Sequence, residues 1–259
     1  MPASAKAILC FDFDGTLIDP HPDPVAIGQL LGFLEDLRLR GAAWVINTGR
    51  SLYSTLDGLQ RCGIRTAPDY IVAREGEIYH LSQFNRWVDF GDWNLRRAKD
   101  HKKFYRSHAK LFHQIRRWLK EHTQAQFISE AQEPAGIVSS TVEEMDSICQ
   151  WLDQHRQEWP DLDYQRNSIY LRFTHCNYSK GTALRELSTV LGIAPAHVFA
   201  AGDNHNDLSM LTREVAHGLA CPSNAISEVK DAVRVQGGFL AAEPATRGCV
   251  AALSHYFYD

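Results

Sequence analysis

The sequence predicts an α/β fold with a doubly wound parallel sheet and a second domain inserted into it. Two observations support this prediction. At both ends of the chain, short apolar runs of strand length alternate with amphipathic helical patterns, an order typical of a parallel sheet covered on both faces. Between them, a stretch of roughly one hundred residues breaks the alternation and is too long for a loop. The 259 residues, 44% of them hydrophobic, suffice for two domains.

The N-terminal part predicts three strands and two helices. Asp23 is the expected cap of the first helix, since Pro24 fits its first turn and Gly41 follows its end. The second helix is expected to stop at Gly63. In order, we expect a strand ending at Phe11, a helix over 25–40, a strand over 42–47, a helix over 51–62 and a strand over 70–73.

The C-terminal part continues the alternation. We expect a helix over 180–191 ended by Gly192, strands over 197–201 and 215–219, and a helix over 225–231. Strands joined in this way pack into a doubly wound, Rossmann-like sheet, in which ligands gather at the carboxyl edge. The predicted core domain therefore comprises residues 1–77 and 175–259.

Residues 78–174 form the predicted inserted domain, which has a different pattern. Strands are expected over 86–90 and 169–174, and apolar residues between 111 and 119 recur at helical spacing. The run 141–144 reads as a capping box that starts another helix. Helices and strands without tight alternation indicate an α+β insert, expected to pack as a cap over the sheet edge.

Two acids interrupt the first apolar strand pattern. Asp12 and Asp14 follow the run that ends at Phe11. Because an uncompensated buried charge is costly, both acids are expected at the carboxyl edge of the sheet rather than in its core. Positions two apart on a strand face the same side, so one carboxylate can attack a substrate while the other transfers protons. The simpler alternative is a turn in which Asp14 caps the backbone.

A second acidic strand end lies far along the chain. Asp203 and Asp207 follow the strand pattern that ends at Ala201. Their spacing brings both carboxylates to one cation if a helix begins near Asn206. Carboxylates repel a phosphate dianion, and Mg²⁺, which prefers oxygen ligands, relieves that repulsion. Taken alone, this segment also fits an Asx-rich turn with helix caps.

Two further segments offer groups that bind phosphate. Thr48 and Gly49 follow the second strand, where a hydroxyl and exposed backbone N–H groups meet a helix start. Lys180 opens a helix, and its ammonium group can balance clustered acids. Taken singly, Thr48 is also typical of an ordinary helix start capped by Ser51, and Lys180 of solvated surface.

Together these segments resemble, in sequence order, the four motifs of the haloacid dehalogenase superfamily of phosphohydrolases. The matching segments are 12–17, 48–50, 179–181 and 202–207. By this resemblance Asp12 is the nucleophile and Asp14 the acid/base. The resemblance also implies Mg²⁺ held by Asp12, the Asp14 carbonyl and Asp203, a phosphoryl group bound by Thr48, Gly49 and Lys180, and an acidic pocket completed by Asp207, directly or through water.

The position of the insert narrows the resemblance. An α+β domain between the second and third motifs resembles the C2B cap of class IIB members, which are linked with small phosphorylated metabolites, especially sugar phosphates. The run 76–79 looks like the sucrose-phosphatase branch, and 223–225 with Val229 like the Cof-type branch. The run 74–76 departs from the Cof-type pattern of Asn, Gly and a small residue, and His205 stands where glycine is common.

The insert contains a strongly basic stretch from Arg96 to Lys120, opposed there only by Asp100. Such a stretch can attract anionic substrates, or it can be the solvated face of amphipathic helices. Other candidate substrate contacts near the end of the insert are Arg166, Asn167 and Arg172, for which exposed surface is the alternative.

Composition limits the other classes of function. The net charge of −4 argues against a general polyanion binder. The six scattered cysteines include no Cys-x-x-Cys pair, so neither a zinc site nor a disulfide framework is expected. We expect a cytoplasmic protein without a targeting segment or membrane span. Its oligomeric state is left open by the sequence.

The sequence thus predicts a Mg²⁺-dependent phosphatase that hydrolyses a small phosphomonoester, a sugar phosphate by resemblance, through a phosphoaspartate at Asp12. A phosphomutase of the same superfamily is the enzymatic alternative. A receiver-like phosphoacceptor module is the non-enzymatic one, although it needs neither Asp14 nor a large insert. Nucleic-acid binding through the basic stretch is a third alternative, which the net charge makes unfavourable.

Overall fold

The computed structural model describes residues 5–19, 21–130 and 133–258. The chain divides into two compact units. The core unit comprises Met1–Asn94 and Lys180–Asp259, and the inserted unit comprises Leu95–Ser179. Within the described residues, no helix is long and apolar enough to cross a membrane.

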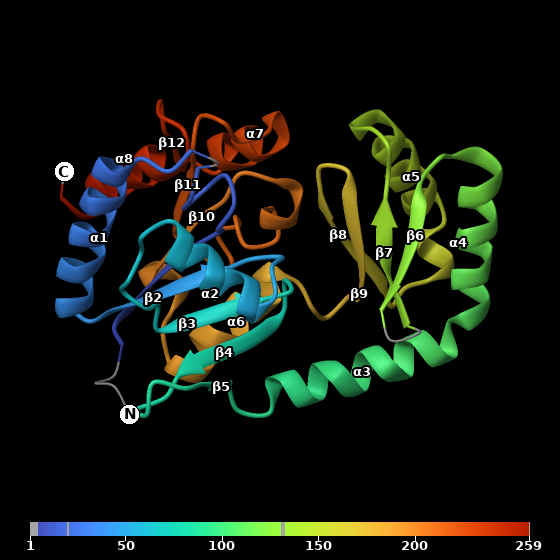
Figure 1. Cartoon of the computed structure of the whole chain (residues 1–259), viewed down its shortest axis with the longest axis horizontal. Coiled ribbons are helices and arrows are strands. Elements are labelled where there is room, and N and C mark those ends of the chain that lie inside the picture. Colours follow the sequence, from blue (N-terminus) through green and yellow to red (C-terminus); the bar gives the residue numbers. More distant parts are fainter. Residues whose placement is uncertain (1–4, 20, 131–132, 259) are drawn as a thin grey trace. The chain divides into compact units, whose positions relative to one another are not determined.

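The core unit is built on one eight-stranded sheet (Figure 1). Its order is β12-β11-β10-β1-β2-β3-β4-β5, and all pairs are parallel except those of β4 with β3 and with β5. The predicted doubly wound α/β fold is therefore confirmed. The strands are β1 (Ala7–Phe11), β2 (Ala42–Asn47), β3 (Tyr70–Ala73), β4 (Glu77–Leu81), β5 (Trp87–Asp89), β10 (Val198–Ala201), β11 (Gly218–Cys221) and β12 (Phe239–Leu240).

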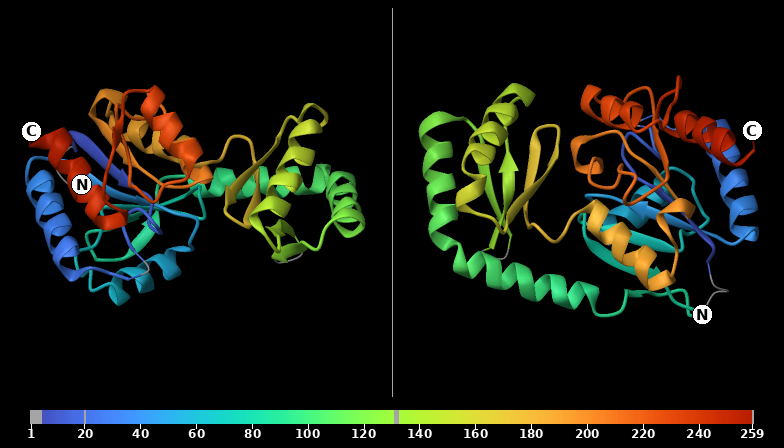
Figure 2. Two further views of the ribbon diagram at one scale, coloured as in Figure 1. Left: turned by 90° about the horizontal axis from the view of Figure 1, so that it is seen from above. Right: turned by 180° about the vertical axis from the view of Figure 1, so that it is seen from behind.

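Helices connect these strands and cover the sheet. As expected, the Asp23 carboxylate caps the first helix by accepting from the Val25 backbone N–H at 2.9 Å. Helices α1 and α8 lie side by side in the views of Figures 1 and 2 and share the apolar core that contains Leu34, Trp44 and Leu253. The helical elements of this unit are α1 (Pro24–Leu39), α2 (Leu52–Arg61), α6 (Lys180–Leu191), α7 (Ser227–Val235), α8 (Ala245–Phe257), and the short turns η2 (Pro195–His197) and η3 (His205–Asp207).

Several boundaries differ from the sequence-based expectation. The strand expected over 86–90 is β5, and β4 was not expected as a strand. Both extend the core sheet, so the inserted unit starts at Leu95 instead of residue 78, and it ends at Ser179 instead of 174. Antiparallel pairing such as Tyr70 with His80 holds these strands to the core, and a pairing partner is a tertiary property that a local pattern does not contain. The strand expected over 215–219 is β11 at 218–221.

The inserted unit contains a four-stranded antiparallel sheet of order β6-β7-β9-β8. Helices α4 and α5 cover one face of this sheet (Figure 2) and share an apolar core with it that includes Ile115, Ile148 and Phe173. The expected α+β character of the insert is therefore observed. Its elements are α3 (Trp93–Ser107), which begins two residues earlier in the core unit, α4 (Ala109–His122), β6 (Gln126–Glu130), β7 (Glu133–Val138), α5 (Val142–Gln154), η1 (Arg156–Glu158), β8 (Leu162–Asn167) and β9 (Tyr170–His175).

A buried histidine ties α3 to the end of β9. His101 is 7% exposed. Its Nδ1–H donates to the Arg97 carbonyl at 2.9 Å, while Nε2 accepts from the His175 backbone N–H at 3.4 Å. Nε2 also lies 3.1 Å from Thr174 Oγ1. The neutral ring with its proton on Nδ1 fits these contacts, because it leaves Nε2 free to accept from the backbone N–H. Burial, aided by the positive charge of Arg97, lowers the pKa of His101 from 6.5 to about 4.

We expect this histidine to make the protein less stable in acid. Between pH 6.5 and about 4 the unfolded chain binds a proton on His101 that the folded chain does not bind, so stability falls as the pH drops. The expected loss between pH 7 and pH 4 is about 3 kcal/mol of unfolding free energy. Urea unfolding of His101→Gln should show a smaller pH dependence, whereas the exposed His113→Gln should match the parent. Equal pH dependence of His101→Gln and the parent would contradict the assignment.

Candidate functional site

The predicted site residues lie where three neighbouring strands end. Strand β1 is central, between β10 and β2. Asp12 follows β1 directly, Thr48 follows β2, and Asp203 comes two residues after β10. Because these strands are parallel, their carboxyl ends meet at one edge, at the point where the chain reverses its direction across the sheet.

Three charged groups form the buried centre of this edge. The Lys180 Nζ donates to Asp12 Oδ1 at 2.5 Å and to Asp207 Oδ1 at 2.7 Å. Lys180 and Asp207 are 0% exposed, and Asp12 is 6% exposed. The alternative that Lys180 is a solvated surface residue is therefore wrong. A lysine buried this completely is stable only because two carboxylates compensate its charge.

Asp203 completes an acidic cluster at this centre. Ligand oxygens of Asp12, Asp203 and Asp207 lie within 4.8 Å of one another. The Thr16 hydroxyl donates to Asp203 Oδ1 at 2.8 Å, and the other oxygen of Asp207, Oδ2, accepts from the Asp203 backbone N–H at 2.8 Å. The short turn η3, rather than a longer helix at Asn206, brings the two acids together.

The cluster carries more negative than positive charge. Burial raises the pKa of Asp12 well above its usual range, with Asp207 and Asp203 adding to the effect and Lys180 opposing it. Burial and the neighbouring Asp207 raise the pKa of Asp203 to about 6. Burial lowers the pKa of Lys180, but Asp12 and Asp207 outweigh that effect and raise it overall. Three carboxyl groups thus share one ammonium group, and this favours a further positive charge at the cluster.

The donor set fits a small divalent cation. The cluster offers carboxylate oxygens, which are hard ligands that Mg²⁺ prefers. The shortage of positive charge around Asp12 and Asp203 favours the same kind of ion. Among the described residues, a second group with metal-ligand chemistry consists of Asp161, His175 and Cys176 in the inserted unit, and it is largely exposed.

Asp14 is placed differently from Asp12. Strand β1 ends at Phe11, so the two acids lie in a loop and do not share a strand face as expected. The Asp14 side chain is 48% exposed and receives two hydrogen bonds from Arg50, from Nε at 2.7 Å and from Nη2 at 2.6 Å. The Asp14 carboxylate is therefore held by a bidentate ion pair outside the buried acidic cluster.

The loop after β2 combines a hydroxyl with tightly fixed backbone. Thr48 is 1% exposed, its backbone N–H donates to the Val72 carbonyl at 2.8 Å, and its Oγ1 accepts from the Arg50 backbone N–H at 3.1 Å. Ser51 caps α2 through the Ser54 backbone N–H, as the alternative interpretation of this segment expected. The cap and the buried threonine coexist, because they involve different residues of one loop.

Other residues at this edge were not assigned a role from the sequence. They are Thr16, which holds Asp203, Arg50, which holds Asp14, and Asn206, whose Nδ2 donates to Glu75 at 2.8 Å. Thr16, Arg50 and Asn206 lie inside the motif segments, so their places in the sequence were the signal that could have identified them. Glu75 lies outside every segment, and only the folded chain brings it to Asn206.

The arginine candidates in the inserted unit have structural partners. Arg166 is 8% exposed and its Nη2 lies 2.6 Å from Asp146 Oδ1, so it is a buried ion-pair residue rather than free surface. Asn167 is exposed and Arg172 is half-buried. Nine basic residues of the stretch from Arg96 to Lys120 are exposed on α3 and α4, as expected for a solvated helix face: Arg96, Lys99, Lys102, Lys103, Arg106, Lys110, Arg116, Arg117 and Lys120.

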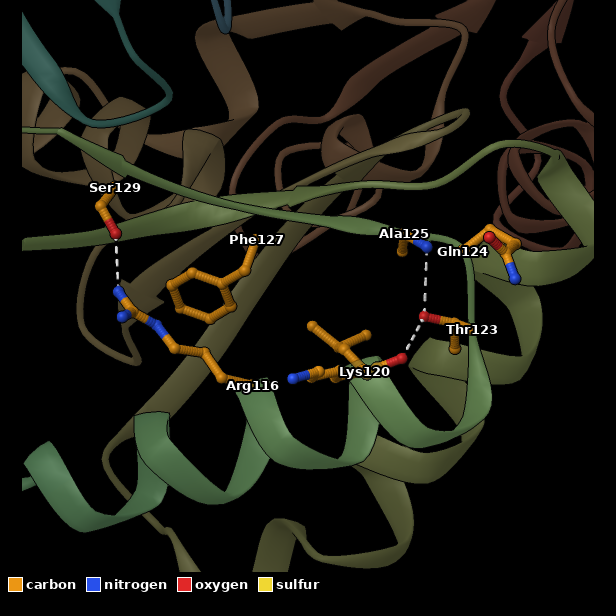
Figure 3. A pocket seen from close by; sticks show the side chains of 8 residues that line it. Arg116, Lys120, Thr123, Gln124, Ala125, Phe127 and Ser129 are labelled. Atoms are coloured by element: carbon orange, nitrogen blue, oxygen red, sulfur yellow. Dashed lines mark hydrogen bonds between the residues drawn. The ribbon is translucent and has the colours of Figure 1, made fainter.

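A hollow of about 520 Å³ lies in the inserted unit between α4 and β6 (Figure 3). The Arg116 guanidinium lies 4.4 Å from the centre of the Phe127 ring and donates to Ser129 Oγ at 2.7 Å. Lys120 and Thr123 also line it. Both of these Arg116 contacts are made within the inserted unit.

Comparisons of sequence and structure agree with this arrangement. Residues 5–257 match the family model "Sucrose-6F-phosphate phosphohydrolase". The solved sucrose-phosphatase of Synechocystis sp. PCC6803, in complex with sucrose and phosphate, superposes with a TM-score of 0.73 at 19% identity, covering 97% of this chain and 98% of that one. The haloacid dehalogenase subclass IIB sugar phosphatase BT4131 gives 0.61 at 17% identity, covering 97% and 99%. At these identities, the two structural matches show that the chain shares the fold of these proteins.

Matches to curated proteins are shorter. A Bacillus subtilis protein provisionally named as a phosphatase, YxeH, is 41% identical over 68 residues, which are 26% of this chain and 24% of YxeH. A Haemophilus influenzae protein with a similar provisional name is 37% identical over 81 residues, 31% of this chain and 30% of that protein. The chain thus spans under a third of the length of these relatives. The family model, in contrast, matches nearly the whole sequence. The chain therefore belongs to the sucrose-6F-phosphate phosphohydrolase family of haloacid dehalogenase-like proteins.

Proposed function

We propose that this protein is a Mg²⁺-dependent phosphatase that hydrolyses a small phosphomonoester, with sugar phosphates as the substrate class. The observation that carries the proposal is the buried Asp12 at the end of the central strand, in contact with Lys180 and beside Asp203 and Asp207. The family and the sucrose-phosphatase that was solved with sucrose and phosphate support the substrate class.

Asp12 is the proposed nucleophile. One of its carboxylate oxygens attacks the phosphorus atom, the bond from phosphorus to the substrate oxygen breaks, and a phosphoaspartate forms. Lys180 contacts Asp12 directly and can also neutralise an oxygen of the transferring group. Thr48 and Gly49, in the loop after the neighbouring strand, are proposed to bind the same phosphoryl group through a hydroxyl and a backbone N–H.

Asp14 is the proposed acid/base. It gives a proton to the leaving alcohol oxygen in the first step and takes one from the attacking water in the second, when phosphate leaves and Asp12 is restored. Its 48% exposed side chain is accessible to both, and Arg50 holds its orientation. A buried Asp14 inside the acidic cluster would instead add to the repulsion of phosphate.

Asp12, Asp203 and the Asp14 carbonyl are the proposed ligands of Mg²⁺, with Asp207 contributing directly or through water. The bound ion would neutralise charge on the transferring phosphoryl group. The proposal is supported by the oxygen donor set and by its excess of negative charge. We further assign the inserted unit as a C2B-type cap, the part of this class that is expected to select the substrate.

The test is a screen of phosphorylated metabolites for phosphate release by the purified chain. We expect release from at least one sugar phosphate with Mg²⁺ present and loss of release after chelation with EDTA. Product analysis separates a phosphatase, which yields free phosphate, from a phosphomutase, which yields an isomerised sugar phosphate. No Mg²⁺-dependent release from any phosphomonoester in the screen would contradict the proposal.

The Arg50–Asp14 pair gives a separate prediction. Arg50→Ala removes both hydrogen bonds to Asp14 and is expected to lower kcat by about tenfold, because a freely rotating acid/base is aligned less often. Arg50→Lys keeps the charge but not the bidentate contact, so kcat should fall to an intermediate value. Steady-state kinetics check this. Arg61→Ala, which removes a comparable but exposed ion pair with Asp57, is the control and should leave kcat unchanged.

A further inference from the structure

The turn between β3 and β4 places a glutamate in a backbone conformation that favours glycine. Glu75 has a φ of 62°, and the preceding Arg74 has a φ of 46°. A side chain in this left-handed region is strained, and such residues persist where surrounding contacts fix them. The sequence departs at this turn from the Cof-type pattern, which has glycine there. The contacts of the Glu75 side chain should therefore explain why a glutamate is present.

The Glu75 side chain is buried and only half satisfied. It is 6% exposed, and its Oε1 accepts a hydrogen bond from Asn206 Nδ2 at 2.8 Å. Within the described part of the chain, neither Glu75 Oε2 nor Asn206 Oδ1 has a hydrogen-bond partner, although both are buried. Burying a carboxylate in this way is unfavourable for folding. Stability alone is thus a poor reason for this residue.

Glu75 connects the two loops that carry the candidate site. Its backbone N–H donates to the Thr48 carbonyl at 2.9 Å. A Cβ on Gly49 would lie 3.3 Å from Glu75 Oε1, so the side chain packs closely against that glycine. On its other side it holds Asn206, which stands in η3 directly before Asp207. The turn η3 contains Asp207, whose Oδ2 accepts from the Asp203 backbone N–H at 2.8 Å, so η3 is linked to both acids.

We propose that Glu75 is a positioning residue, which holds η3 through Asn206 so that Asp203 and Asp207 keep the spacing needed to bind Mg²⁺. The inference deepens the proposed function and rests on it for the identity of the ion. Removing a group that hydrogen-bonds to a metal ligand and so orients it typically lowers metal affinity or activity by about 10- to 100-fold. Glu75 thus stabilises the site at the expense of a strained turn.

The test separates positioning from general stability with two substitutions. Glu75→Gln keeps an oxygen that accepts from Asn206, so its Kd for Mg²⁺ should match that of the parent. Glu75→Gly removes the contact but also relieves the backbone strain, so its thermal midpoint should stay the same or rise while its Kd for Mg²⁺ increases by about tenfold or more. Mg²⁺ binding is measured by isothermal titration calorimetry without substrate, and thermal midpoints are measured without metal.

Asn85→Gly is the matched control. Asn85 also has a positive φ, of 55°, in the exposed turn after β4, so its replacement relieves similar strain without touching η3. We expect an unchanged Kd for Mg²⁺ in this variant. A parent-like Kd in Glu75→Gly, or a rise in Kd equal to that in Asn85→Gly, would overturn the inference. Because binding is measured without substrate, this outcome is independent of whether the screen finds phosphatase activity.

Discussion

Asp12→Asn is expected to lower kcat/KM for the phosphomonoester substrate by about 10⁴-fold or more, in line with the loss of a nucleophile in other covalent enzymes. The amide cannot form a phosphoaspartate. Its oxygen and nitrogen have nearly the shape of the carboxylate, so contacts with Lys180 at the end of β1 should be largely kept. Steady-state phosphate release at saturating Mg²⁺ measures the effect.

Asp57→Asn is the control for replacing an aspartate by an asparagine away from the candidate site. Asp57 makes an exposed ion pair with Arg61 on α2, and exposed pairs of this kind contribute little to stability or activity. Its activity should equal that of the parent. Thermal unfolding of Asp12→Asn should show a folded protein, since the substitution removes a carboxylate whose burial is unfavourable. A folded Asp12→Asn protein with near-parental activity would exclude Asp12 as the nucleophile.

Lys180→Met is expected to have the largest effect on stability. Lys180 is 0% exposed and is bonded to two carboxylates. Methionine fills a similar volume but leaves Asp12 and Asp207 buried without a cation, which costs about 3–5 kcal/mol of unfolding free energy. For a chain of this size that corresponds to a thermal midpoint lower by roughly 10 °C. Differential scanning calorimetry in the absence of divalent ions measures the change.

A double-mutant cycle identifies the cause of this effect. Asp207→Asn removes one of the two carboxylates that Lys180 compensates, so Lys180→Met should cost less in that background. Added Mg²⁺ should also restore part of the lost stability, because a bound cation replaces the missing positive charge. Additive effects of the two substitutions, with no change on adding Mg²⁺, would show that Lys180 acts through packing rather than charge.

Local patterns in the sequence predicted the elements that present the site. Apolar runs followed by acids located the ends of β1 and β10, and those ends indeed lie side by side with the end of β2. The clearest local signals were also confirmed in detail, such as the cap at Asp23. Spacing alone was less reliable. The two-residue separation of Asp12 and Asp14 suggested a shared face, but β1 ends before either residue.

The remaining features depend on contacts between distant segments. The predicted start of the insert at residue 78 rests on the break in the alternation of strands and helices. Only the antiparallel pairing of β4 with β3 and of β5 with β4 assigns these two strands to the core sheet. The sequence predicts that Lys180 balances clustered acids, but the helix start alone does not show that it is buried, since a lysine there is normally solvated. It is buried because Asp12, 168 positions away in the sequence, compensates its charge.

The α/β class, the presence of an α+β insert and the chemical types available at the sheet edge could be predicted from the sequence, because they follow from hydrophobic period, length and residue identity. Which of those groups meet depends on the tertiary structure. It placed Asp12, Asp203, Asp207 and Lys180 in one buried cluster and paired Asp14 with Arg50 outside it. It also brought Glu75 to Asn206. Burial and charge compensation act between residues far apart in the chain, so no local pattern contains them.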